Sequence, residues 1–143
     1  MDEKLFYLAT KAVVIHKGKV LLLRRSLREI AMPSFWDFPG GRFKAGQPTT
    51  HTTLVKNLQR EVLEETGIRK IKVDKRIHVD LLHHGIPSQL DVGLVFFVYK
   101  CDLKSSPIIQ LSPEHTAYKW FSPKHLPKDL IRYQKQAILA AFN

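Results

Sequence analysis

The segment Leu58–Ile68 reads LQREVLEETGI and decides how the rest of this sequence is interpreted. Its apolar spacing predicts a helix, and within two turns it places Glu61, Glu64 and Glu65. Residues three or four positions apart lie on one face of a helix, so the three carboxylates project together. Carboxylate oxygens suit a hard divalent cation such as Mg²⁺, whose charge would remove the repulsion between them. The alternative interpretation is a solvated acidic face that pairs with Arg60 and Lys56 on the same helix.

Length and composition indicate a soluble globular protein. The chain has 143 residues, of which 44% are hydrophobic and 25% charged, so we expect a single domain over residues 1–143. No apolar run reaches the roughly 20 residues that span a bilayer, and the acidic Asp2 and Glu3 do not fit a signal peptide. Cys101 is the only cysteine, which excludes an internal disulfide and fits a reducing compartment. The sequence therefore predicts a cytoplasmic protein without membrane contact.

The charge balance favours an anionic partner. Lys and Arg number 23 against 13 Asp and Glu, which gives a formal net charge of +10. An excess of this size is typical of proteins that bind nucleotides, nucleic acid or acidic surfaces. A basic but merely solvated surface is the equal alternative. The basic residues are scattered along the chain, so charge predicts an anion without identifying it.

Hydrophobic periodicity predicts strands interleaved with two helices. Strands are expected as a hairpin within 12–25, with a tight turn at Lys17–Gly18, and over 71–79, 91–101 and 118–121. Helices are expected from Leu54 to a stop at Gly67 and over 130–142, and the Pro- and Gly-rich segment 26–48 is expected to be loop. One half-buried strand face is predicted to hold Ile71, Val73, Ile77 and Val79. The segment 91–101 is apolar on both faces, as in a central strand, and the whole order predicts an α/β fold with helices against a mixed sheet.

Two motifs in order make this sequence resemble the Nudix (MutT-like) hydrolases. The family signature is Gly, five residues, Glu, seven residues, then Arg-Glu-apolar-x-Glu-Glu-x-Gly-apolar. Its second half matches here at every fixed position: Arg60, Glu61, Val62, Glu64, Glu65, Gly67 and Ile68. Its lead-in is matched within WDFPGGRFKAG by Pro39, Gly40 and Gly41. The resemblance covers nearly the whole chain and implies a Nudix-type α/β/α sandwich with a mixed β-sheet between helices.

The resemblance implies hydrolysis of a nucleoside diphosphate linked to another group, assisted by Mg²⁺ or Mn²⁺. Metal ions on the phosphates neutralise the charge that builds up when water attacks phosphorus. Glu61 and Glu65, one turn apart, are the expected direct ligands, and Glu64 belongs to the same metal cluster. Glu61 and Glu64 are also catalytic candidates. Glu114, within LSPEHTAYKWF, is expected to act as a base or extra ligand, and the alternative is a capping or exposed loop glutamate.

Two arginines and two glycines are assigned to substrate binding or to the motif itself. Arg24 and Arg25 sit where an arginine in similar proteins can reach phosphate. Neighbouring side chains on a strand point to opposite faces, so one of the two could equally be an exposed residue without a role in binding. Gly41, without a side chain, would let the backbone approach the substrate closely. Gly40 belongs to the structural part of the motif.

The first half of the signature departs from the family. Gln47 stands where the family has glutamate, and twelve residues instead of seven separate it from Arg60, with PTTHTT as the insertion. Counting back from Arg60 instead places Thr52 at the glutamate position and Gly46 at the glycine. The upstream glutamate is missing in both alignments. Its loss is expected to weaken metal affinity or the orientation of Arg60, which by resemblance is a structural brace.

Several other polar and aromatic residues are weaker candidates. Asp80 and Asp91 could supply further acids. The pair His83-His84 has no third ligand at metal-site spacing, so we interpret both as solvated loop residues. Phe35 and Trp36 are expected to pack beneath the loop that precedes the glycines rather than to stack on a base.

Three functions are compatible with these residues. The first is Mg²⁺-dependent hydrolysis of a nucleoside triphosphate, normal or oxidised, to the monophosphate and pyrophosphate. The second is hydrolysis of ADP-ribose or a dinucleoside polyphosphate. The third is a catalytically weak module that binds nucleotides or RNA, suggested by the missing glutamate, the insertion and the charge of +10. RNA is not the favoured partner, and the oligomeric state does not follow from the sequence.

Overall fold

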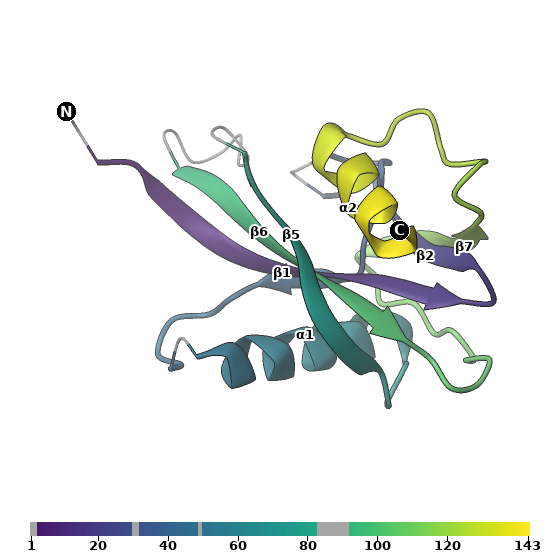
Figure 1. Cartoon of the computed structure of the whole chain (residues 1–143). Coiled ribbons are helices and arrows are strands. Elements are labelled where there is room, and N and C mark those ends of the chain that lie inside the picture. The colour runs from purple at the N-terminus through teal and green to yellow at the C-terminus, as the bar shows by residue number, and fades with distance from the viewer. Residues whose placement is uncertain (1–2, 30–31, 49, 83–91) are drawn as a thin grey trace.

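The computed structural model describes residues 3–29, 32–48, 50–82 and 92–143 as one mixed sheet with a helix on each face (Figure 1). In chain order the elements are β1 Leu5–His16, β2 Lys19–Arg25, β3 Trp36–Asp37, β4 Gly40–Arg42, α1 His51–Thr66, β5 Lys72–Leu82, β6 Val92–Asp102, β7 His115–Phe121 and α2 Arg132–Phe142. The predicted α/β/α sandwich with a mixed sheet is confirmed. Within the described ranges, neither helix is long and apolar enough to cross a membrane.

Strand β1 is the axis of the sheet. It runs parallel to β6 from Leu5 to Ile15 and antiparallel to both β2 and β4. The predicted hairpin between β1 and β2 is present, with positive φ at both Lys17 (50°) and Gly18 (74°), the geometry of a tight two-residue turn. The described strands follow the order β3-β2-β1-β6-β5, and β4 pairs with β1 while β7 pairs with β2.

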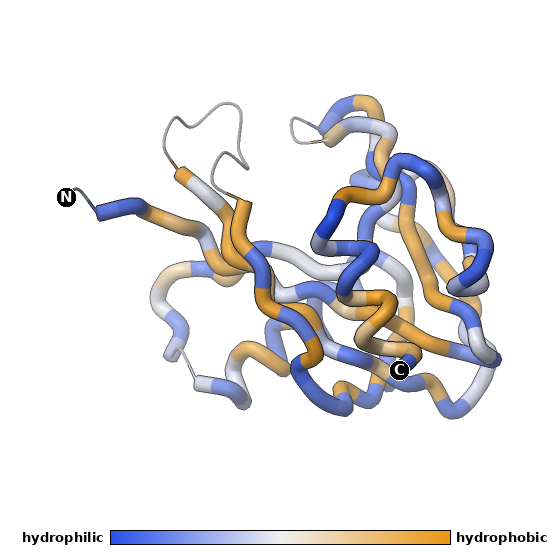
Figure 2. Tube along the Cα trace, turned by 45° about the horizontal axis from the view of Figure 1, so that its top comes forward, coloured by the Kyte–Doolittle hydropathy of each residue, from blue (hydrophilic) through white to orange (hydrophobic). Residues whose placement is uncertain are grey.

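The sheet separates two hydrophobic cores, because successive side chains of a strand point to opposite faces. The core under α2 includes Val13, Val20, Leu22, Phe96, Val98, Ala137 and Ile138. The core under α1 includes Ala12, Val14, Leu21, Leu23, Leu58, Val62, Tyr99 and Cys101. Hydrophobic and hydrophilic residues alternate along both helices (Figure 2), so each helix buries one face. Strand β6 contributes to both cores, which confirms the predicted central strand.

Strand β5 departs from the simple alternation that its sequence predicts. Its register against β6 shifts twice, between Val73 and Lys75 and between Arg76 and His78. Each shift adds a residue to β5 and turns the following side chains to the other face of the sheet. Val73 therefore packs in the core under α1 and Ile77 in the core under α2. Val79, predicted to lie inward with them, is 46% exposed.

The segment 26–48 is not wholly the loop that its prolines and glycines predict. It contains β3, which pairs with β2, and β4, which pairs with β1. Both strands are very short, and a run of two or three residues carries no periodicity that a sequence could reveal. The C-terminal helix also begins later than expected, at Arg132, with Ile131 as its N-cap and Leu130 buried ahead of it.

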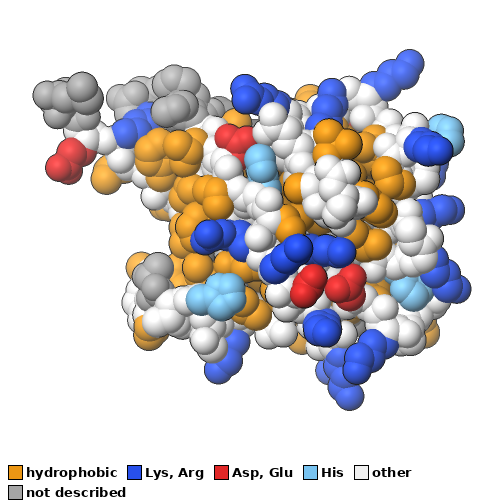
Figure 3. All heavy atoms as spheres, in the orientation of Figure 1, with side chains coloured by type: hydrophobic (Ala, Val, Ile, Leu, Met, Phe, Trp, Pro, Cys, Tyr) orange, Lys and Arg blue, Asp and Glu red, His pale blue; other side chains and the backbone are white. Residues whose placement is uncertain are grey.

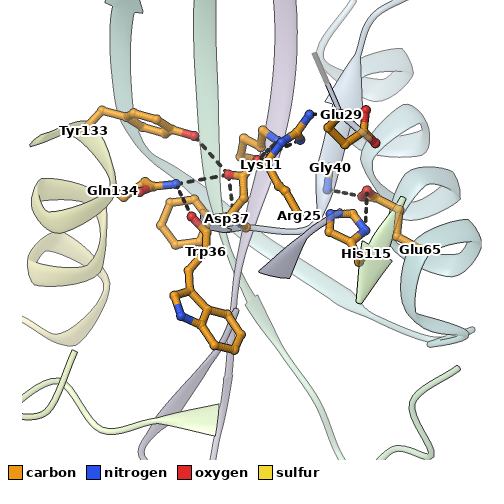
Figure 4. A network of polar contacts seen from close by, with 11 residues as sticks. Lys11, Arg25, Glu29, Trp36, Asp37, Gly40, Glu65, His115, Tyr133 and Gln134 are labelled. Atoms are coloured by element: carbon orange, nitrogen blue, oxygen red, sulfur yellow. Dashed lines mark hydrogen bonds and ion pairs between the residues drawn. The ribbon is translucent and has the colours of Figure 1, made fainter. Parts of the chain in front are cut away.

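A buried carboxylate, Asp37 of β3, joins strands of the sheet to α2 (Figure 4). Its Oδ2 lies 3.0 Å from Lys11 Nζ of β1 and 3.5 Å from Arg25 Nη1 of β2. Its Oδ1 accepts from the Tyr133 hydroxyl (3.4 Å) and from Gln134 Nε2 (3.2 Å), both on α2. Burial alone would raise the pKa of Asp37, but the neighbouring positive charges of Lys11 and Arg25 outweigh burial and lower it. The carboxylate is therefore ionised, and both of its oxygens have hydrogen-bond or ion-pair partners.

We expect Asp37→Asn to destabilise the protein by about 3–5 kcal/mol, because it leaves the buried Lys11 ammonium without its counter-charge. Urea unfolding at neutral pH measures the change. Asp129→Asn, at an exposed position before α2, is the matched control and should change stability by less than about 0.5 kcal/mol. Equal stability of the two variants would show that the ion pair contributes nothing.

The same carboxylate should make stability depend on acid. Because the pKa of Asp37 is lowered by folding, its stabilising effect is present above its unfolded pKa of about 4 and is lost as pH falls through the lower folded value. The difference in unfolding free energy between the wild type and Asp37→Asn should therefore narrow on acidification below about pH 4. Urea midpoints across a pH series test this, and a constant difference would contradict it.

Candidate active site

Helix α1 carries the acidic segment. It begins at His51, where the Thr50 side chain accepts from Thr53 N, and ends where Gly67 takes φ +78° and donates its N–H to Leu63 O. The predicted stop at Gly67 is confirmed. The start lies three residues before the predicted Leu54, so part of the PTTHTT insertion forms the first turn of the helix. The residues of the predicted insertion therefore lie at the end of α1 away from the glutamates.

Two glycines let β4 pass between β1 and α1. A Cβ atom at Gly40, whose φ is +143°, would collide with the Thr10 carbonyl oxygen and lie 2.9 Å from Lys11 Cα. A Cβ atom at Gly41 would lie 2.7 Å from the Glu61 carboxylate. The first glycine is thus required by backbone packing, and the second leaves room for an acidic side chain. Gly41 faces Glu61 in this structure; its predicted contact with substrate stays a prediction.

Glu65 is the most enclosed acid of the helix. Its side chain is 5% exposed, and its Oε1 accepts a 2.8 Å hydrogen bond from Gly40 N. Its Oε2 faces His115 Nδ1 at 3.9 Å. Burial raises the pKa of Glu65 to about 8, and the positive charge of Lys11 only partly opposes this. Burial therefore disfavours the charged form of this carboxyl, and a further positive charge nearby would stabilise it.

Glu61 and Glu64 are more open to solvent. The Glu61 side chain is 14% exposed, and burial raises its pKa, with Arg60 opposing and the charges of Glu64 and Glu114 adding to the shift. Glu64 is 55% exposed and pairs with Arg60 Nη1 at 3.0 Å. The three helix acids and Glu114 thus influence one another electrostatically, although they differ in burial.

Arg60 is held on three sides without the upstream glutamate of the signature. Its guanidinium contacts Glu61 (3.2 Å) and Glu64 (3.0 Å) and donates to Asn57 Oδ1 (2.7 Å). Asn57 is buried and donates in turn to Thr10 Oγ1 of β1 (3.1 Å). Asn57 was not predicted from the sequence, because its burial depends on how α1 packs against β1. The expected effect of the missing glutamate on the orientation of Arg60 stays a prediction.

Neither candidate for the missing glutamate position enters this arrangement. Gln47 is exposed in the loop before α1, and Thr52 is exposed in the first turn of the helix. The predicted effect of the change at Gln47 on metal affinity stays a prediction.

Glu114 lies in the loop directly before β7, far from α1 in the sequence. Its carbonyl accepts from Ser26 N (2.8 Å), which fixes the loop before β7 against the end of β2. In the described part of the chain, Glu65, Glu114 and His115 each offer one ligand atom, and these atoms lie within 4.8 Å of one another. This group does not include Glu61 or Glu64. The structure thus adds His115, which the sequence did not single out, and draws the predicted Glu114 and Glu65 together.

The NUDIX domain family model matches residues 7–142 of this sequence. The chain belongs to the Nudix family. It is similar to the 8-oxo-dGTP diphosphatase of Buchnera aphidicola, with 29% identity over 113 residues that cover 79% of this chain and 77% of the relative. The 8-oxo-dGTP diphosphatase of Proteus vulgaris is 30% identical over 98 residues, which cover 68% of this chain and 79% of the relative. The protein is therefore a Nudix pyrophosphohydrolase, as its signature predicted.

Solved structures agree on the fold. The MutT protein from Methanosarcina mazei Go1 superposes with a TM-score of 0.74 at 24% identity, over 97% of this chain and 94% of that one. The MutT Nudix hydrolase from Burkholderia pseudomallei gives 0.71 at 23% identity, over 94% of this chain and 97% of that one. These likenesses support the Nudix α/β/α sandwich.

The two predicted phosphate-binding arginines of this Nudix chain are engaged with neighbouring residues. Arg24 donates to Ser34 O (3.2 Å), and its guanidinium lies 5.8 Å from the ring centre of Trp36. Arg25 pairs with Asp37 and, at 3.7 Å, with Glu29. Both arginines line one cavity of about 360 Å³, together with Leu27, Ser34, Thr116 and Ala117. Their contact with phosphate stays a prediction.

The weaker candidates are placed as follows. Asp80 lies 3.3 Å from His78 Nε2 on β5. Trp36 packs edge-on against Phe121, with ring centres 5.1 Å apart, which confirms packing rather than a free stacking face for this residue. The predictions for His83-His84 and Asp91 lie outside the described residues.

We expect alanine at the two motif glycines to have different effects. Gly41→Ala should leave stability near that of the wild type, because only a flexible carboxylate has to move, but a displacement of Glu61 by about 1 Å can cost about 100-fold in turnover. Gly40→Ala should destabilise the fold by about 1–3 kcal/mol, because backbone has to move. Urea unfolding and pyrophosphohydrolase turnover separate the two effects. Full turnover in Gly41→Ala would show that the close approach of Glu61 to Gly41 is not needed.

Proposed function

We propose that this Nudix enzyme hydrolyses a nucleoside triphosphate, normal or oxidised, to the monophosphate and pyrophosphate, with Mg²⁺ as its cation and Mn²⁺ as a substitute. The observation that carries the proposal is the meeting of Glu65 from α1 with Glu114 from the loop before β7. Two relatives named 8-oxo-dGTP diphosphatase support the triphosphate as substrate. Water would form a bond to phosphorus as the phosphoric anhydride bond breaks, and pyrophosphate would leave.

The donor set of the site fits a hard divalent cation. Glu61, Glu65 and Glu114 would hold the ion through oxygen, which Mg²⁺ prefers, with Glu64 at the exposed margin of the same cluster. Burial raises the pKa values of Glu61 and Glu65, so these carboxyls would gain from a compensating positive charge. The bound ion supplies charge neutralisation at the phosphates and a more acidic water.

The protein's own residues would then divide the remaining work. Glu61, Glu64 and Glu114 are the candidates to accept the proton of the attacking water, and Glu114 is exposed with no resolved ion pair in the described structure. Arg60 would orient Glu61 and Glu64 through its two ion pairs. A displaced carboxylate cannot serve as base, because a proton acceptor has to lie within hydrogen-bond reach of the water.

A cavity between β5 and α2 offers space for the nucleoside. It measures about 450 Å³, within the range of small-molecule sites, and is lined by Met32, Asp80, Leu81, Leu82, Ile131, Arg132 and Tyr133. Tyr133 in its wall donates a hydrogen bond to Asp37, Asp37 pairs with Lys11, and the positive charge of Lys11 acts on Glu65 of the acidic site. We propose that the base enters this cavity while the phosphates extend toward the glutamates.

The other two hypotheses receive less support. The predicted binder without turnover was suggested partly by the charge of +10, yet the visible face in Figure 3 shows basic side chains spread apart rather than gathered into one track. Hydrolysis of ADP-ribose or a dinucleoside polyphosphate differs from the favoured reaction in its products. Product analysis therefore separates these enzyme hypotheses.

Mg²⁺ should stabilise the folded protein through Glu65. An ion that binds only the folded state at about 100 times its Kd raises the free energy of unfolding by about 2.7 kcal/mol. We expect this rise in the wild type and in Asp129→Asn, and its loss in Glu65→Gln, because the enclosed carboxylate would no longer be available. Thermal and urea unfolding with and without Mg²⁺ measure it. An equal rise in Glu65→Gln would remove Glu65 from the ion's site.

Glu61→Gln should lower turnover by about 100-fold or more while leaving the fold intact, because the amide neither accepts a proton nor carries the ligand charge. The assay offers deoxynucleoside triphosphates, 8-oxo-dGTP, ADP-ribose and a dinucleoside polyphosphate with Mg²⁺, and chromatography identifies both products. Monophosphate with pyrophosphate is the expected pair. A preference for ADP-ribose, or release of orthophosphate from a triphosphate, would contradict the proposal, and Asp129→Asn serves as the control for turnover.

A further inference from the structure

The ring of His115 has no assigned role, although it lies beside the acidic group. His115 begins β7, where its backbone pairs with Arg25 of β2 and its N–H donates to Ser112 O (3.2 Å). The imidazole is 2% exposed, and its Nδ1 has no hydrogen-bond partner among the described residues. A buried polar atom left unpaired costs about 1–3 kcal/mol, so each such atom calls for a physical reason.

The acceptor that faces this nitrogen belongs to Glu65 (Figure 4). The distance from His115 Nδ1 to Glu65 Oε2 is 3.9 Å, which is too long for a hydrogen bond. Glu65 Oε1 is already fixed by Gly40 N at 2.8 Å. A shift of about 1 Å in the glutamate or the loop would bring Oε2 into hydrogen-bond range of the ring. Hydrogen bonds in active sites are often long before substrate and cofactor bind.

The chemistry of the ring favours donation over direct coordination. A neutral imidazole has one N–H and one lone pair, so Nδ1 either donates to a carboxylate or binds a cation. Glu65 and Glu114 already supply the oxygen ligands that Mg²⁺ prefers. With its proton on Nδ1, a neutral ring would offer Glu65 Oε2 a donor without adding charge beside the ion.

We propose that His115 is a positioning residue whose Nδ1–H donates a hydrogen bond to Glu65 Oε2 when that carboxylate binds the cation. This inference rests on the proposed function, because it takes Glu65 to be a ligand. With Gly40 N–H on one oxygen and His115 on the other, the carboxylate directs its remaining lone pairs toward the ion. Donors that orient a metal ligand in this way change metal affinity or activity by about 10- to 100-fold.

Three substitutions distinguish a donor from a space-filling side chain. His115→Asn places an amide nitrogen near the position of Nδ1, His115→Gln places one near Nε2, and His115→Leu fills the space without any donor. Calorimetric titration with Mg²⁺ and with Mn²⁺ should show affinity reduced by about 10- to 100-fold in the Gln and Leu variants. The Asn variant should stay close to the wild type. His125→Leu, at an exposed position, is the control and should bind the ions normally.

Nitrogen-15 NMR of the Mg²⁺-loaded wild type gives a second readout, which does not depend on whether the variants fold. The Nδ1 of His115 should carry the proton. Three results would overturn the proposal: an unprotonated Nδ1, wild-type affinity in His115→Leu, or an Asn variant as weak as the Leu variant. Absence of Mg²⁺ and Mn²⁺ binding by the wild type would instead contradict the proposed function itself.

Discussion

The buried ion pair between Lys11 and Asp37 is the interaction on which this architecture depends. Asp37 accepts hydrogen bonds from α2 and forms ion pairs with Lys11 of β1 and Arg25 of β2, so one carboxylate connects three elements. The positive charge of Lys11 also acts on Glu65, where it partly opposes the effect of burial. The α2 side of the sheet and the acidic end of α1 therefore share one electrostatic environment, and a disturbance of either would be felt in the other.

The parts of the fold and site that the sequence predicted are those encoded by local spacing. The glutamates of α1 follow helical periodicity, and Gly67 ends the helix in the left-handed conformation that glycine adopts most readily. The hairpin turn at Lys17–Gly18 is likewise a two-residue pattern. The motif glycines were recognised by resemblance, and the structure supplies the physical reason: a side chain at Gly40 would collide with the backbone of β1, and one at Gly41 would displace the Glu61 carboxylate.

The parts that were not predicted depend on register between distant strands. His115 meets Glu65 only because β7 pairs with β2, and the sequence does not state that pairing. Asn57 supports Arg60 only because α1 lies against Thr10 of β1. The two register shifts in β5 reverse the faces that alternation predicts, and no residue type marks where they occur. Local pattern therefore identified the acids of α1 but not the groups that hold them.

The tether from Gly40 N–H to Glu65 fixes α1 near its C-terminal end, and Asn57 adds a second attachment one turn before Arg60. The opposite end of the helix is exposed and carries part of the insertion. Residues can therefore be added at the N-terminal end of α1 without moving the glutamates near its C-terminal end. Evolution can therefore vary the length of the connection between β4 and α1 independently of the chemistry, and protein engineers could place a reporter or an affinity tag there.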